Sequence, residues 1–173
     1  RRGRQVCAVK TYQKLDVVQV ANLVGGVIAA EHPARVCIDV GGLGAGVFDV
    51  LVANGFAECI TAVNFGERAD SPERYVNRRA EMWARAAEWL KSPLPVSLPD
   101  VPGLVEDLTA PLKMYDALGR LQREAKADIK KRLGRSTDAA DALALTFAIQ
   151  NAEYLLKAGS ARDGDFVDDS VYL

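Results

Sequence analysis

The chain has 173 residues, 49% of them hydrophobic and 26% charged, which is enough for one globular domain with a full core. A formal net charge of −1 and a pI near 5.9 exclude a globally basic nucleic-acid-binding protein, so any basic surface must be local. No apolar run approaches the ~20 residues of a membrane span, and we expect a cytoplasmic location.

Hydrophobic patterning predicts alternating strands and helices over residues 1–158, followed by an acidic, mobile tail over 159–173. Residues 4–12 alternate like a strand that follows a hairpin tip, and Asp16 is the expected N-cap of a helix ending near residue 31. The later elements are predicted as strands at 36–40 and 59–63, helices at 47–54, 72–90, 103–108, 124–133 and 136–148, and a hairpin formed by 113–115 and 120–123.

The three cysteines lie in apolar, strand-like runs. Their number is odd and none of them forms a C-x-x-C pair, which argues against a zinc site. We therefore expect buried thiols at Cys7, Cys37 and Cys59.

Asp39 follows an apolar strand directly and precedes a glycine-rich turn at 41–46. The glycine spacing does not match the dinucleotide fingerprint, and no Gly-Lys-Ser/Thr follows as in a P-loop. A carboxylate at the carboxyl end of a buried strand is held rigidly at the sheet edge where α/β folds place their chemistry. Asp39 is thus a candidate ligand or catalyst.

A second acidic cluster opens the predicted helix at 136–148. Asp138 and Asp141 are spaced i, i+3 in its first turn, where the helix dipole favours negative charge. Asp141 also lies in a run of small apolar residues, and a charge buried there must be paired or bound to metal. Lys126 is one candidate partner, and a cation shared with Asp39 is the other. Oxygen ligands of this kind favour Mg²⁺ or Mn²⁺.

Basic residues in two regions are candidates for a local phosphate track. At Arg78 and Arg79 we favour an ordinary solvated helix face, and the aromatic residues of that helix are expected to pack in the core. The other members of the track are Lys126, Lys130, Lys131, Arg132 and Arg135.

Five segments, in order, resemble the C-terminal nuclease domain of tailed-phage terminase large subunits: 39–47, 63–66, 75–83, 121–126 and 136–148. The resemblance implies an α/β, RNase H-like fold in which helices flank a mixed sheet. It implies an endonuclease that uses two divalent ions, Mg²⁺ or Mn²⁺, to cut concatemeric double-stranded DNA during packaging. The implied partners are DNA, the portal protein, the small terminase subunit and the ATPase domain of the same polypeptide, in the host cytoplasm.

The resemblance also assigns roles by position. Asp39 resembles the family's second acidic ligand, Asp141 the third, and Asp138 an accessory position, while Lys126 matches a lysine near the metals or the scissile phosphate. The family's first acidic ligand and first strand precede the segment matched here, so we expect a fragment that binds metal weakly when isolated.

Two alternatives remain open at this stage. The first is another RNase H-like nuclease or recombinase of the junction-resolvase type. The second is a docking module of the packaging motor without catalytic activity.

Overall fold

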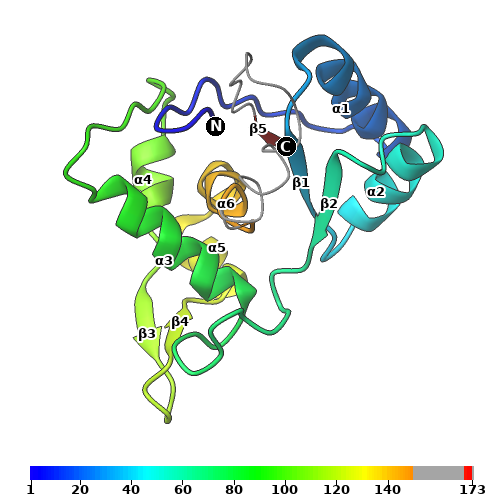
Figure 1. Cartoon of the computed structure of the whole chain (residues 1–173). Helices are drawn as coiled ribbons and strands as arrows, with labels where there is room; N and C mark the ends of the chain where they lie inside the picture. The colour runs from blue at the N-terminus through cyan, green and yellow to red at the C-terminus, as the bar shows by residue number, and fades with distance from the viewer. Residues whose placement is uncertain (150–169, 173) are drawn as a thin grey trace.

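In the computed structural model, the described residues form a sheet of three parallel strands, with β1 (Arg35–Asp39) at its centre. β2 (Ile60–Val63) pairs with one side of β1 and β5 (Ser170–Tyr172) with the other (Figure 1). The structure describes residues 1–149 and the backbone of 170–172. Because the strands run the same way, their carboxyl ends meet at one edge of the sheet.

A two-stranded antiparallel hairpin stands apart from this sheet, as predicted. It consists of β3 (Lys113–Tyr115) and β4 (Leu121–Arg123). The helices of the described residues are α1 (Val17–Glu31), α2 (Gly44–Ala53), α3 (Arg78–Leu90), α4 (Leu104–Thr109), α5 (Lys126–Leu133) and α6 (Asp138–Leu145). None of them is long and apolar enough to cross a membrane.

The helices form layers on both faces of the sheet (Figure 1). Val36 and Ile38 of β1 pack in one core with α1 and α2, whereas Cys37 packs in a second core with α3 and α6. Side chains alternate between the two faces of a strand. Asp39 therefore shares the face of Cys37, which is the face covered by α6.

Local sequence explains where several helices begin and end. Asp16 forms the expected cap of α1: its Oδ1 accepts from the Gln19 amide at 2.8 Å, and Gln19 Oε1 accepts from the Asp16 amide at 2.9 Å. Gly134 ends α5 with a φ of 71°, as predicted.

The predicted strand at residues 4–12 is wrong. Among the described residues this segment forms two isolated bridges, one from Gln5 to Arg2 and one to Ser97. In the second, the Val6 amide donates to the Ser97 carbonyl at 2.9 Å and the Ser97 amide to the Arg4 carbonyl at 3.0 Å. An alternating pattern needs a neighbouring strand of similar length, and one residue does not supply it. Cys7 is consequently exposed, which corrects the expectation of a buried thiol, and Cys59 is only partly buried.

Several helix boundaries also differ from the prediction, and α2 begins at Gly44 rather than at residue 47. α3 begins at Arg78 rather than near residue 72, because Asn77 Oδ1 caps the helix by accepting from the Ala80 amide at 3.0 Å. α6 ends at Leu145 rather than at residue 148. There Arg85 Nη1 donates to the Phe147 carbonyl at 3.1 Å instead of the helix continuing.

The predicted mobile tail lies mostly outside the described residues. Its last described part, Ser170–Tyr172, forms β5 and pairs with residues 35–37 of β1. Valine and tyrosine are strand-forming residues, and β1 offers them a row of backbone donors and acceptors.

Candidate active site

Asp39 lies at the carboxyl end of β1 and its side chain is one-third exposed. Its Oδ1 accepts from the Gly41 amide at 3.0 Å, which fixes the carboxylate over the following turn. The chain then comes back so closely that a Cβ on Gly44 would lie 2.0 Å from the Asp39 carbonyl oxygen. Glycine at this position therefore allows α2 to start directly beside Asp39.

Asp141 lies in the first turn of α6, and its side chain is only 6% exposed. Its Oδ1 accepts two hydrogen bonds from α3, one from Trp83 Nε1 at 2.8 Å and one from Arg79 Nε at 3.2 Å. Its Oδ2 is buried and accepts no hydrogen bond. One oxygen of this carboxylate is thus fully used, and the other is available to a further ligand.

Lys126 stands between the two carboxylates. Its Nζ lies 3.2 Å from Asp141 Oδ2 and 3.8 Å from Asp39 Oδ2. The first of these is an ion pair without the orientation of a hydrogen bond, because Asp141 Oδ2 accepts none. The two Oδ2 atoms are at most about 7 Å apart, the sum of the two distances. The structure thus brings together the three residues that the sequence singled out.

Asp138 is placed differently. It is the first residue of α6, is exposed, and accepts a hydrogen bond from the hydroxyl of Ser136. Among the described residues, no group of three or more His, Cys, Asp or Glu side chains could hold a metal ion. Asp138 therefore does not complete a three-carboxylate cluster with Asp39 and Asp141, and its position suits favourable charge at a helix start.

The donor set nevertheless fits a hard divalent cation. Asp39 and Asp141 supply only carboxylate oxygens, and one of these is buried without a hydrogen-bond donor. Two carboxylates this close need positive charge between them, which the Lys126 ammonium provides here. Oxygen ligands suit Mg²⁺ and Mn²⁺, whose full coordination requires further oxygens from other groups or water.

Arg79 was wrongly predicted to lie on a solvated helix face. It is 7% exposed and contacts Asp141, and its Nη1 donates to the Glu124 carbonyl at 2.8 Å. Trp83 packs in the core as predicted, and its indole N–H also donates a hydrogen bond to the carboxylate of Asp141. The available signal was the need of a buried Asp141 for donors, together with the i, i+4 spacing of Arg79 and Trp83.

Most of the predicted phosphate track is occupied by other contacts. Arg132 Nη2 donates to Glu124 Oε2 at 2.6 Å, and this hydrogen bond holds the pKa of the Glu124 carboxyl below its usual value. Arg135 pairs with Glu106 at 3.2 Å, and Arg78 pairs with Asp70. The exposed members of the track on α5 are then Lys126, Lys130 and Lys131, together with the paired Arg132.

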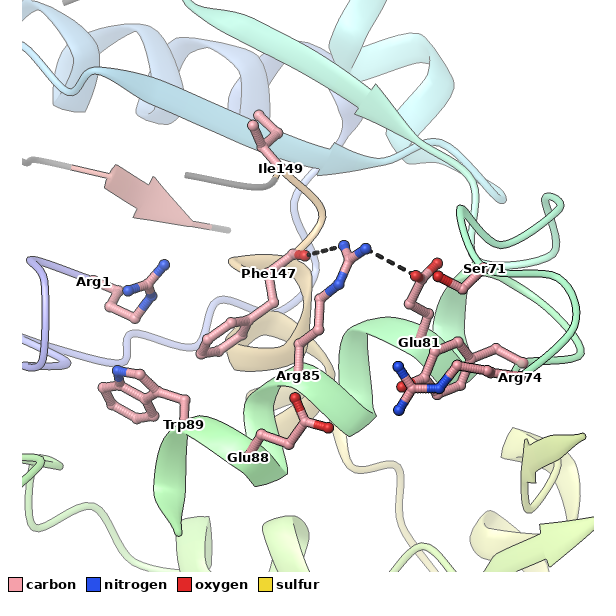
Figure 2. Close-up of a pocket in the computed structure, with 10 residues that line it drawn as sticks. Arg1, Ser71, Arg74, Glu81, Arg85, Glu88, Trp89, Phe147 and Ile149 are labelled. Atoms are coloured by element: carbon pink, nitrogen blue, oxygen red, sulfur yellow. Dashed lines mark hydrogen bonds and ion pairs between the residues drawn. The ribbon is translucent and has the colours of Figure 1, made fainter. Parts of the chain in front are cut away.

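A cleft of about 350 Å³ lies elsewhere, beside the carboxyl-terminal half of α3 (Figure 2). Figure 2 shows Arg85 reaching across it to the Phe147 carbonyl and to Glu81. Neither Asp39 nor Asp141 lines this cleft. The carboxylate pair is therefore a site separate from this cleft.

No protein-family model matches the chain, and no curated protein matches it either. Solved structures do. The nuclease domain of the large terminase subunit gp2 of bacterial virus Sf6 matches with a TM-score of 0.70 at 15% identity, covering 87% of this chain and 80% of that one. A mutant of that domain with manganese matches with a TM-score of 0.70 at 18% identity, covering 87% and 81%.

A further mutant structure of the same viral domain, with calcium, matches with a TM-score of 0.69 at 18% identity, covering 87% of this chain and 80% of that one. At such low identity these matches establish the architecture. They confirm the predicted α/β class and the predicted similarity of fold to terminase nuclease domains. The chain has the same overall fold as the nuclease domain of a terminase large subunit.

Proposed function

We propose that the chain is the nuclease domain of a phage DNA-packaging terminase and that it hydrolyses phosphodiester bonds of concatemeric double-stranded DNA. The observation that carries the proposal is the meeting of Asp39 and Asp141, from distant segments, around one ammonium nitrogen. Two carboxylates brought together at the carboxyl edge of a parallel sheet suit metal-assisted hydrolysis. The similarity of fold to terminase nuclease domains supports the same assignment.

Asp39 and Asp141 would hold Mg²⁺ or Mn²⁺, with Asp138 as an accessory acid at the exposed end of α6. A pair of such ions, when bound, activates a water molecule and stabilises the leaving oxygen. Asp141 presents its Oδ2 toward that place, and Asp39 presents its own Oδ2. The two carboxylates do not make a complete ligand set, so the intact centre uses at least one further oxygen ligand.

Lys126 is half-exposed and carries its charge between the two carboxylates. It would balance the two acids in the absence of ions and contact the scissile phosphate when DNA is bound. Lys130 and Lys131, exposed on the same helix, would contact neighbouring phosphates. Since phosphate contacts carry no base information, cleavage should depend little on DNA sequence.

Within a packaging motor, the domain would act beside the portal protein, the small terminase subunit and the ATPase domain of its own polypeptide, in the host cytoplasm. These partners are part of the proposal. Capture of a purified portal protein by a variant that lacks both Asp39 and Asp141 would show docking independent of cleavage.

Conversion of supercoiled plasmid to nicked and linear DNA in Mg²⁺ or Mn²⁺ tests the proposal. The wild-type chain, and the same chain extended at its N-terminus, should be compared with Asp39→Ala and Asp141→Ala. We expect each variant to lose roughly 100-fold or more of the activity, because each removes a ligand of the divalent ions that would stabilise the negative charge of the transition state.

Asp49→Ala is the matched control, because Asp49 is exposed on α2 and is not one of the proposed ligands. It should cleave like the wild type. Equal cleavage by the wild type, Asp39→Ala and Asp141→Ala, in both the short and the extended chain, would reject the proposal.

A further inference from the structure

Two side chains of α3 donate hydrogen bonds to the carboxylate of Asp141. Arg79 and Trp83 are four residues apart and so lie on the same face of the helix, toward α6. Arg79 Nε and Trp83 Nε1 both donate to Asp141 Oδ1, at 3.2 and 2.8 Å. All three side chains are at least nine-tenths buried. Water therefore has little access to replace either donor.

The two oxygens of Asp141 are consequently not equivalent. Oδ1 is occupied by two donors, one of them charged. Oδ2 accepts no hydrogen bond and is the oxygen that faces Lys126, which also faces Asp39. A carboxylate held by one oxygen can turn only at the cost of both bonds. The arrangement thus presents one defined oxygen to the candidate metal centre.

Arg79 also contacts the backbone that precedes Lys126. Its Nη1 donates to the Glu124 carbonyl at 2.8 Å, two residues before Lys126. One planar guanidinium therefore joins the carboxylate of Asp141 to the backbone that leads into α5. The fork geometry of arginine suits this double role, whereas the single ammonium of a lysine cannot reach both acceptors in the same way.

We infer that Arg79 and Trp83 are positioning residues that fix which oxygen Asp141 offers to the metal, and that Arg79 also sets the place of Lys126. The inference rests on the proposed function, because it assigns these residues to the same centre. Groups that orient a metal ligand typically change metal affinity by about 10–100-fold when they are removed.

A purely structural role would give a different result. If Arg79 and Trp83 served only to neutralise and pack around a buried acid, their replacement would lower the free energy of unfolding without a selective effect on Mn²⁺. Replacements of equal size elsewhere on α3 would then behave in the same way. Metal affinity measured without DNA separates the two roles.

The first measurement needs no metal. In the ¹⁵N-correlated NMR spectrum of the full chain, Asp141→Asn should shift the signals of the Trp83 indole N–H and the Arg79 Nε–H. Asp39→Asn should leave both signals in place, because Asp39 contacts neither donor. Unchanged Trp83 and Arg79 signals in Asp141→Asn would show that these two hydrogen bonds to Asp141 do not form in solution, and would overturn the inference.

The second measurement is a titration with Mn²⁺ alone, followed by paramagnetic broadening of amide signals near Gly41 and Asp141. We expect Trp83→Phe, which keeps the ring but loses the N–H, and Arg79→Lys, which keeps the charge but loses the fork, to weaken Mn²⁺ binding by about tenfold. The matched controls are Trp89→Phe and Arg85→Lys, on the same helix but without contact to Asp141. Both controls should bind Mn²⁺ like the wild type.

The outcomes are distinguishable. Unchanged Mn²⁺ affinity in Trp83→Phe and Arg79→Lys, with wild-type binding intact, would overturn the inference and leave the proposed function standing. An equal loss of Mn²⁺ affinity in the two controls would also overturn the inference, because any substitution on α3 would then weaken Mn²⁺ binding. Absence of localised broadening in the wild type would overturn the metal centre and the inference together.

Discussion

At the scale of single residues, Lys126 supplies the positive charge that offsets the two carboxylates of the candidate centre. Its Nζ lies within 4 Å of both Asp39 and Asp141, so the acids are held together in the absence of a metal ion. An ion that enters between the carboxylates must displace this ammonium or share the space with it. The lysine is therefore a competitor of the cation as well as a candidate phosphate contact.

Lys126→Ala should therefore raise Mn²⁺ affinity while lowering DNA cleavage. We expect an increase of about fivefold in affinity, which corresponds to the roughly 1 kcal/mol that a partly exposed ion pair contributes. Calorimetric or NMR titration with Mn²⁺ measures it, and Lys130→Ala on the same helix is the control. Weaker binding in Lys126→Ala would show that the ammonium supports the ion instead of competing with it.

At the scale of elements, the junction between β1 and α2 sets the position of Asp39. The strand delivers the carboxylate to the sheet edge, and the helix starts at Gly44 almost against the Asp39 carbonyl. A methyl group at position 44 would meet this backbone oxygen at 2.0 Å, and a backbone atom cannot move aside as a side-chain tip can. Either the end of β1 or the start of α2 must therefore move to make room for the methyl group.

Gly44→Ala should lower the free energy of unfolding by about 1–3 kcal/mol, as overpacking at a close contact typically does. It should also weaken Mn²⁺ binding, because Asp39 moves with the strand end. Gly42→Ala is the matched control, since nothing lies within 4 Å of a Cβ there. Chemical denaturation and Mn²⁺ titration of both variants provide the check, and equal behaviour of the two would contradict the argument.

For the molecule as a whole, β1 separates two cores. One core packs α1 and α2 against Val36 and Ile38, and the other packs α3 and α6 against Cys37. Burial raises the pKa of the Cys37 thiol from its ordinary 9.0 to about 11. The thiol is thus a probe of the layer that carries Asp141.

The raised pKa predicts a loss of stability at alkaline pH. A thiol whose folded pKa exceeds its unfolded pKa keeps its full contribution below pH 9, and this contribution falls as the pH rises toward 11. Between these values the unfolding free energy of the wild type should fall by about 2 kcal/mol more than that of Cys37→Ala. Denaturation at several pH values measures it. Cys7→Ala, at an exposed site, should follow the wild type, and a parallel fall in all three proteins would refute the assignment.

The sequence predicted the parts of the site that depend on local pattern. Asp39 follows an apolar run and Asp141 interrupts one, so each residue was recognisable alone. The distance between the two carboxylates was not predictable, because it depends on how α6 packs over β1. Arg79 was misassigned because an arginine was expected in solvent, although its i, i+4 spacing from Trp83 places both side chains on the face of α3 toward α6. β5 was missed because three residues carry no usable periodicity.

The lysine between the two acids has a consequence for handling the protein. Because an internal ammonium already supplies the positive charge, the fold does not need a divalent ion to hold its two acidic segments together. Exhaustive treatment with a chelator should leave the melting temperature nearly unchanged, whereas added Mn²⁺ should raise it only in proportion to the ion's affinity.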